Sequence, residues 1–187
     1  MNPVAAIRRS AERLSGLVDD LLALARAEEG GRGAERRDAD AVTLVREACR
    51  HAEVEAQPRG VRFVLDLPER LEVGVDGDAL ARVYVNVISN AAKFSLPDGE
   101  VRVSLRATGR SVEMTCADDG VGISEADQAT VFDMFRRARN AHTHGVPGSG
   151  VGLAISQRIV ARLGGSIELE STPGEGSTFV VRVPAAR

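Results

Sequence analysis

The 187-residue chain has no tryptophan, only 3% aromatic residues and a single lysine, Lys93, among its 24 basic residues. Its formal net charge is −3, and no arginine-rich stretch has aromatic residues interleaved with it. Proteins that hold nucleic acid use a basic surface, commonly with aromatic side chains for stacking. The composition therefore argues against nucleic acid as a partner.

Cysteines and long apolar runs are also scarce. The two cysteines, Cys49 and Cys116, lie far apart in apolar-patterned segments, which favours neither a disulfide framework nor a Cys-x-x-Cys metal site. No run of about 18 apolar residues could span a bilayer, and the residues after Met1 lack the pattern of a secretion signal. We therefore expect a soluble, cytoplasmic chain with reduced thiols, the size of one domain with a small addition.

The first 30 residues predict one long amphipathic helix. Apolar or small residues recur at alternating intervals of three and four, at Val4, Ile7, Ala11, Leu14, Val18, Leu21 and Ala25. This spacing is typical of a coiled coil or helical bundle, although a helix packed on its own domain would also explain it. Gly30-Gly31-Arg32-Gly33 should end the helix. We predict two units, residues 1–30 and residues 31–187.

The rest of the chain alternates between helical and strand patterns. Helices are expected at residues 40–57, at residues 78–94 and from residue 151, with Asp40 as the first N-cap and Pro58 and Gly60 as stop signals. Strands are expected at 61–67, 71–75, 101–107, 111–117, 166–170 and 177–183, the last four as two hairpins. This order predicts an α+β fold, a two-layer α/β sandwich with hairpins on one side and three helices on the other.

Asn86, Asn90 and Lys93 are the first candidates for a functional site. Their spacing of four and three puts them on one face of the helix at 78–94, so they could converge on one ligand. An amide oxygen suits Mg²⁺, which keeps several waters and takes phosphate oxygens for the remainder. A lysine would supply a point charge for the same phosphates. Taken alone, the three residues would also fit a solvated polar helix face.

Asp118 ends a predicted strand in which every second residue is apolar. A buried carboxylate at this point could accept a hydrogen bond from the exocyclic amino group of adenine, which would select adenine over guanine. Gly120 and Gly122 would let the backbone approach the ring or take a positive φ. Taken alone, Asp-Asp-Gly also reads as an ordinary turn.

Gly148, Gly150 and Gly152 open the helix predicted from residue 151. Such a helix start presents free backbone N–H groups and a positive dipole end, so it predicts a cradle for phosphate. The spacing is neither that of a Rossmann fingerprint nor that of a P-loop, and Lys93 lacks the neighbours that a P-loop requires. Both of these common nucleotide-binding folds are disfavoured.

The order of these motifs is more specific than any one of them. In sequence they are Asn86-x-x-x-Asn90-Ala-x-Lys93-Phe94, Asp118-Asp119-Gly120-Val121-Gly122-Ile123, Gly148-Ser149-Gly150-Val151-Gly152-Leu153 and Gly174-Glu175-Gly176-Ser177-Thr178-Phe179. With them the chain resembles, over residues 35–184, the histidine-kinase branch of the family that contains DNA gyrase, Hsp90-type chaperones and MutL. The motifs match the family's N, G1, G2 and G3 boxes, and residues 131–135 look like its F box.

The resemblance implies the Bergerat (GHKL) fold and a protein-histidine kinase that binds ATP with Mg²⁺. Asn86, Lys93 and Arg137 would act in phosphoryl transfer, and Asn90 would be the Mg²⁺ ligand. The nucleotide contacts would come from Asn90, Phe94, Asp118, Gly120, Gly122, Ile123, Gly148, Gly150, Gly152, Leu153, Ser177 and Thr178. A plain β-hairpin would also explain the last two. Asp119 stands where the family usually has asparagine, so the pocket rim should be more acidic.

Residues 136–147 are charged and nearly devoid of apolar side chains, which predicts a lid. In the family this loop closes over ATP, and Arg137 matches an arginine that reaches the phosphates. A plain solvated loop is the alternative, and His142 and His144 are spaced to chelate a metal.

Asn86 stands where the ATP-hydrolysing branches of the superfamily place a glutamate that activates water, and an amide has no useful basicity. The nucleophile should therefore come from elsewhere. In sensor kinases it is a histidine on the first helix of a dimeric bundle, and residues 1–29 resemble the second helix. We therefore expect an acceptor histidine upstream of Met1, a homodimer through the N-terminal helix in the full-length protein, and a response-regulator receiver domain as partner. The full-length protein could be anchored to a membrane.

None of His51, His142 and His144 occupies the acceptor position, so this chain alone should not phosphorylate itself. A stand-alone ATPase or serine-directed kinase of the same superfamily, and a nucleotide-binding scaffold without transfer, are the alternatives. Asn86 argues against the ATPase and the N-terminal heptad pattern against the stand-alone kinase. The intact Asn90, Lys93 and Arg137 argue against the scaffold.

Overall fold

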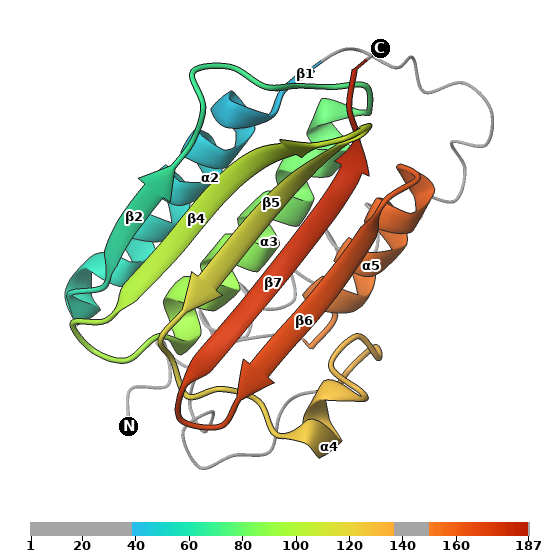
Figure 1. Ribbon diagram of the computed structural model, residues 1–187. Helices are drawn as coiled ribbons and strands as arrows, with labels where there is room; N and C mark the ends of the chain where they lie inside the picture. The colour runs from blue at the N-terminus through green and yellow to red at the C-terminus, as the bar shows by residue number, and fades with distance from the viewer. Residues whose placement is uncertain (1–38, 137–149, 187) are drawn as a thin grey trace, which may run out of the picture.

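The computed structural model describes residues 39–136 and 150–186. A five-stranded sheet and three principal helices form two layers (Figure 1). Helices α2, α3 and α5 cover one face of the sheet, and no described helix covers the other face. The predicted α+β two-layer sandwich is confirmed. The helix predicted over residues 1–30 and the boundary near residue 30 lie outside the described residues.

Helix α2 (Ala41–Ala56) has the N-cap that its sequence predicts. The Asp40 carboxylate accepts a hydrogen bond from the backbone N–H of Val42 at 3.1 Å, which satisfies one of the unpaired amides of the first turn. The helix runs into a 3-10 turn, η1 (Gln57–Arg59), which ends at Gly60 with φ at 69°. This left-handed glycine stops the helix and turns the chain toward the sheet.

Helix α3 (Gly77–Phe94) carries the N box and lies centrally on the sheet. Its N-cap is Asp76, whose carboxylate accepts from the backbone N–H of Ala79 at 3.1 Å. The short α4 (Glu125–Gln128) follows the G1 box, and α5 (Gly152–Arg162) follows the G2 box. None of the helices in the described parts of the chain is long and apolar enough to cross a membrane.

The main sheet has the strand order β2-β4-β5-β7-β6. Its pairs are antiparallel except β2 with β4, which run parallel. The strands are β2 (Arg62–Asp66), β4 (Glu100–Thr108), β5 (Ser111–Asp118), β6 (Ser166–Thr172) and β7 (Gly176–Pro184). The two predicted hairpins are therefore β4–β5 and β6–β7.

A second, two-stranded sheet joins β1 (Ala39–Asp40) to β3 (Glu72–Val73) in antiparallel register. On its other side, Val73 bridges Ala185 near the C-terminal end of the chain. The strand expected at 71–75 is thus short and lies outside the main sheet.

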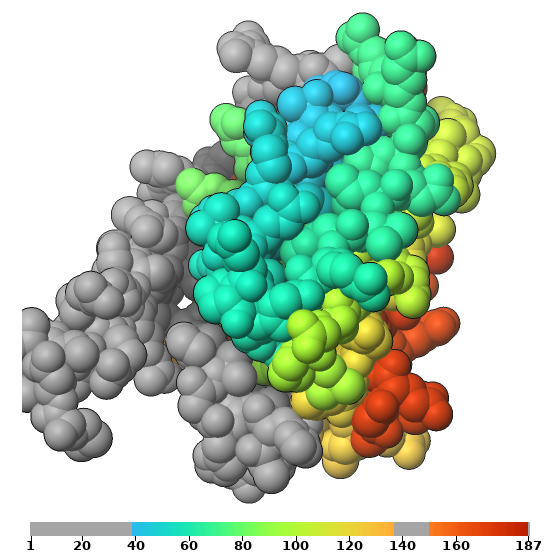
Figure 2. Space-filling model, turned by 90° about the vertical axis from the view of Figure 1, so that its left-hand side faces the viewer, coloured from blue at the N-terminus to red at the C-terminus, as the bar shows by residue number. Residues whose placement is uncertain are grey.

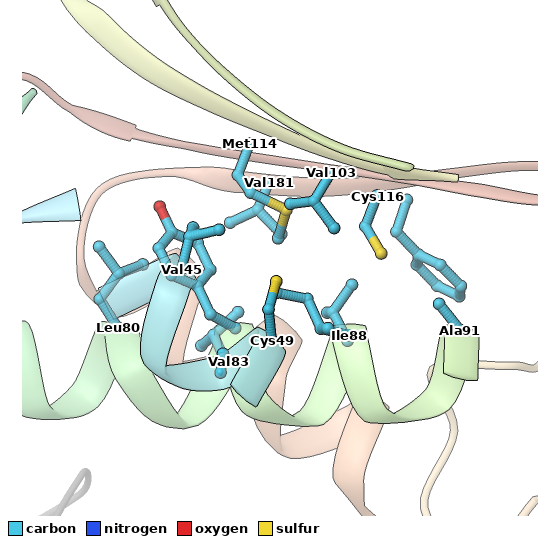
Figure 3. Packing of buried hydrophobic residues seen from close by; sticks show 14 of the residues in the cluster. Val45, Cys49, Leu80, Val83, Ile88, Ala91, Val103, Met114, Cys116 and Val181 are labelled. Carbon is cyan, nitrogen blue, oxygen red and sulfur yellow. The ribbon is translucent and has the colours of Figure 1, made fainter. Parts of the chain in front are cut away.

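The core lies between the sheet and the helices (Figure 3). Side chains of α2 and α3, such as Cys49 and Ile88, point toward Val103 of β4 and Met114 of β5. Full burial of one large aliphatic side chain contributes about 1.5–3 kcal/mol. Along β5 the buried residues alternate with half-buried ones, as one covered face requires. Continuing that alternation to the end of β5 places Asp118 on the helix-covered side.

Candidate nucleotide-binding site

Asp118 is 8% exposed at the end of β5. Its partner in the β5–β7 register is Ser177, which is also buried. Burial raises the pKa of the Asp118 carboxyl to about 6, although hydrogen bonds from the backbone of Gly120 and Ser177 lower it and the charge of Asp119 raises it further. The Gly120 N–H donates to Oδ1 of Asp118 at 2.9 Å. A buried carboxylate is stabilised by each further donor, and an adenine amino group is such a donor.

The two predicted glycines of the G1 box lie where no side chain fits. A Cβ at Gly120 would collide with the carbonyl oxygen of Phe94 at the end of α3. Val121 donates its N–H to that same oxygen at 3.2 Å, so the G1 loop is bonded to the C-terminus of the N-box helix. Gly122 has φ at 64°, and a Cβ there would collide with the carbonyl oxygen of Thr172. Phe94 thus contributes its backbone carbonyl to the assembly of the site.

Two residues that the sequence analysis missed hold the G1 loop on the β6–β7 hairpin. The Ser171 hydroxyl accepts from the N–H of Ile123 at 2.8 Å and donates to the carbonyl of Gly176 at 2.7 Å. It also lies 3.0 Å from the Ser177 hydroxyl. The Gln128 amide donates to the carbonyls of Ile123 and Ser171 at 2.7 Å and 2.8 Å. Ile123 is therefore fixed by its backbone beside Ser177.

Ser177 and Thr178 point to opposite faces of the sheet. Buried residues alternate along β7, and Ser177 and Phe179 belong to the helix-covered set. Thr178 is half-buried between Ala117 of β5 and Glu170 of β6, on the face that no described helix covers. Side chains one residue apart on a strand face opposite ways, so Thr178 does not lie on the Asp118 face, and its expected contact with the nucleotide stays a prediction. Of the two residues, only Ser177 shares the face of Asp118.

Asn86 connects α3 to α5. Its Nδ2 donates to the hydroxyl of Ser156 at 2.9 Å. Its amide also lies against Gly152, where a Cβ would come within 3.0 Å of the Asn86 Cγ and closer still to Oδ1. Asn86 therefore lies between α3 and the start of α5 and contacts both, and its expected part in phosphoryl transfer stays a prediction. Ser156 carried no sequence signal of its own.

Asn90 is half-buried one turn further along α3, and its side chain makes no hydrogen bond to any other described residue. Residues 39–136 and 150–186 contain no group of three His, Cys, Asp or Glu side chains that could hold a metal ion. An amide oxygen together with phosphate oxygens and water nevertheless fits Mg²⁺, which is commonly bound in this way. The donor set therefore fits a cation that arrives with a phosphate chain.

Lys93 follows on the same helix face, and its ammonium nitrogen lies 3.6 Å from the carboxylate of Glu55 on α2. The lysine side chain is 36% exposed and that of Glu55 46% exposed. The predicted phosphate-binding cation thus has a carboxylate partner within the protein.

Asp119, the departure from the family pattern, has a structural role. Its two carboxylate oxygens accept from the N–H of Glu100, both at 3.0 Å, at the first residue of β4. Its charge also raises the pKa of Asp118.

The F and G2 boxes meet at Gly150, whose carbonyl accepts from the N–H of Phe135 at 2.8 Å. Gly150 has φ at 72°, and Leu153 in the first turn of α5 packs against the core. The other predicted contacts, Arg137 and Gly148, lie outside the described residues, as do His142 and His144.

The sequence of this chain is similar to those of known proteins. Residues 75–187 match the family described as histidine kinase-, DNA gyrase B-, and HSP90-like ATPase. The sensor-like histidine kinase SenX3 of Mycobacterium tuberculosis is 35% identical over 175 residues, which cover 94% of this chain and 43% of that protein. The circadian input-output histidine kinase CikA of Synechococcus elongatus is 32% identical over 97% of this chain and 24% of that protein. The chain spans less than half the length of these relatives.

Solved structures agree with the sequence matches. The mycobacterial sensor histidine kinase MprB superposes with a TM-score of 0.72 and 27% identity, over 80% of this chain and 98% of that chain. Full-length ShkA in complex with AMPPNP superposes with a TM-score of 0.78 and 26% identity, over 98% of this chain and 38% of that chain. From the fold, the motif geometry and these similarities, the chain belongs to the histidine kinase-, DNA gyrase B- and HSP90-like ATPase family, with an ATPase domain of the sensor histidine kinase kind.

Proposed function

We propose that this chain is the ATP-binding catalytic part of a protein-histidine kinase in a two-component system. The observation that carries the proposal is the buried Asp118 carboxylate beside Ser177. The exocyclic amino group of adenine would donate to this carboxylate. Guanine has a carbonyl oxygen at the corresponding position, which a carboxylate would repel. A site that hydrogen-bonds one such group can discriminate by about 10⁴-fold.

The phosphates would lie along the face of α3 toward the start of α5. Within the described residues the first turn of α5, at Gly152 and Leu153, has no side-chain cap, and such a helix start favours an anion. Lys93 would contribute its charge and Asn90 a ligand for Mg²⁺, which neutralises charge on the transferring phosphates when it is bound. Arg137 and Gly148 are assigned to the same task from the motif alone.

The acceptor is proposed to be a histidine of a helical bundle. An amide at position 86 cannot take a proton from water, and its Nδ2 is already bonded to Ser156. Among the described residues the one histidine is His51, in an exposed position on α2, a helix that carries none of the proposed nucleotide contacts. Residues 1–30 would supply the second helix of the bundle and the contact of a homodimer. A receiver domain of a response regulator would take the phosphoryl group onward, with no role for nucleic acid.

A cytoplasmic location is part of the same proposal, because the substrate is ATP. Both cysteines are free and buried in the core, which agrees with a reducing compartment.

Labelling with γ-³²P-ATP and Mg²⁺ tests the proposal. The chain should bind ATP, and acid-labile label should appear only on an added helical-hairpin domain that carries a phosphoacceptor histidine, because positioning supplies most of the rate in phosphoryl transfer. Excess unlabelled GTP should not compete. Label on this chain alone, or efficient competition by GTP, would contradict the assignment, as would rapid release of inorganic phosphate without any acceptor.

A further inference from the structure

The end of α2 and the turn η1 contact Lys93 through both its side chain and its backbone. Glu55 pairs with the Lys93 ammonium at 3.6 Å. The Arg59 guanidinium donates to the backbone carbonyl of Lys93 at 2.6 Å. Figure 2 shows the face formed by α2 and β2, where the end of α2 lies beside the loop that follows α3. The corner of residues 55–59 therefore holds both the backbone and the side chain of Lys93.

Lys93 is the only lysine of the chain, and it shares a helix face with Asn86 and Asn90. Its ammonium is a compact charge on a flexible stem, so it can exchange one anionic partner for another. Phosphate oxygens of a nucleotide would compete with the Glu55 carboxylate for this single cation. They would also be repelled by that carboxylate, since like charges at short range oppose each other.

We propose that Glu55 is a competing counter-ion for Lys93, and that it lowers the affinity of the site for the phosphate chain without affecting the adenine end. This inference rests on the proposed function. The Lys93–Glu55 pair is partly exposed, so it contributes little to stability and can be exchanged readily. Glu55 then acts as a positioning residue that sets how tightly ATP is held and how readily the product ADP leaves.

The test compares Glu55→Gln with Glu53→Gln, an exposed glutamate two residues earlier on the same helix. Both variants remove one negative charge from α2. At low ionic strength, Glu55→Gln should bind ATP about two- to fivefold tighter by isothermal titration, the range expected for one exposed ion pair. Adenosine should bind wild type and variant equally. In a Lys93→Gln background, the effect of Glu55→Gln should fall to that of Glu53→Gln.

The single lysine also gives a direct spectroscopic readout. With ¹³C-lysine labelling, the Lys93 ε-methylene resonance should shift when ATP is added to wild type. It should shift in Glu55→Gln without nucleotide, and not in Glu53→Gln.

Three results would overturn the inference: equal effects of the two glutamine variants, weaker ATP binding in Glu55→Gln, or a Glu55→Gln effect that persists without Lys93. If wild type binds ATP and any of these is found, this inference alone fails. If wild type binds neither ATP nor adenosine, the proposed function fails with it.

Discussion

The Asp118 carboxyl has its pKa raised to about 6, mainly by burial. The pKa of an exposed aspartate is about 3.9, so the folded state binds this proton more tightly than the unfolded state. The stabilisation from the proton is complete below about pH 4 and is lost as the pH rises through about 6. At pH 7.5 the ionised carboxylate therefore costs the folded state up to about 3 kcal/mol. The group that is proposed to recognise adenine is a source of instability at neutral pH.

Asp118→Asn should raise the free energy of unfolding at pH 7.5 by about 1–3 kcal/mol, because the amide has no charge to bury. The gain should vanish near pH 4, and ATP binding should weaken strongly at neutral pH. Urea unfolding at the two pH values measures the first effect and titration with ATP the second. Asp119→Asn is the neighbouring variant with the same charge change; it should leave ATP binding largely intact and give only a small part of the stability gain, because the Asp119 charge is a minor cause of the raised pKa of Asp118. A variant less stable than wild type at pH 7.5 would refute the electrostatic explanation.

Gly152→Ala should destabilise the protein by about 1–3 kcal/mol, since the new methyl group would overlap the Asn86 amide. It should also weaken ATP binding, because the start of α5 must move away from α3. Asn86→Ala in the same chain removes the overlap, so the double variant should be more stable than the sum of the two single changes predicts. Urea unfolding of the four proteins gives the coupling. Strict additivity would show that the two residues do not meet as described.

At the scale of elements, the C-terminus of α3 is held by residues remote in sequence. Arg59 donates to the carbonyls of Ala92 and Lys93 at 3.1 Å and 2.6 Å, and it also donates to Ser95. The backbone N–H of Val121 donates to the carbonyl of Phe94. Carbonyls in the last turn of a helix have no partner within it, and the negative end of the helix dipole favours a cation there. One arginine thus caps the helix that carries the N box.

Arg59→Ala should lower the free energy of unfolding by about 1.5–3 kcal/mol, the usual range for hydrogen bonds from a charged donor to partly buried acceptors. Arg59→Lys should recover part of the loss, since it keeps the charge but not the planar fork. Arg62→Ala is the control, an exposed arginine three residues away on the edge strand β2. Equal losses for Arg59→Ala and Arg62→Ala would show that the cap contributes nothing.

Elements whose signals are local could be predicted from the sequence. Helix α2 begins after the cap at Asp40 and ends before Gly60, because each signal acts within a few residues of its own position. The role of Arg59 could not be predicted, since its acceptors lie 33 to 36 positions away. The same holds for the parallel pairing of β2 with β4 and for the small β1–β3 sheet. Such pairings depend on the assembled fold.

In the candidate site too, features with a local sequence signal could be predicted, and features that depend on distant partners could not. The place of Asp118 followed from strand alternation, and the structure agrees. Alternation along β7 separates Ser177 from Thr178, which the G3 motif by itself does not. Ser156, Ser171 and Gln128 had no signal, because a buried serine or a half-exposed glutamine looks like any other until its partner is known.

At the scale of the whole molecule, the first described strand and the end of the last one lie close together in space. Val73 pairs with Ala39 on one side and with Ala185 on the other. Neighbouring strands lie about 4.8 Å apart, so Ala39 and Ala185 are separated by about 10 Å. Ala39 and Ala185 therefore lie at one corner of the described structure, near the top of Figure 1.

Asp118 lies at the opposite end of the sheet from that corner. Strand β5 runs from Ser111, opposite Pro184, to Asp118, a length of about 23 Å. If that corner is fixed, a rotation of the domain has its pivot near Val73, beside one end of the main sheet, and Asp118 lies at the other end. Each rotation of about 10° at the pivot would carry the adenine end through about 4 Å. A rotation of the whole domain would therefore move a bound nucleotide by several ångströms for each step of about 10°, while the packing of its core stays unchanged.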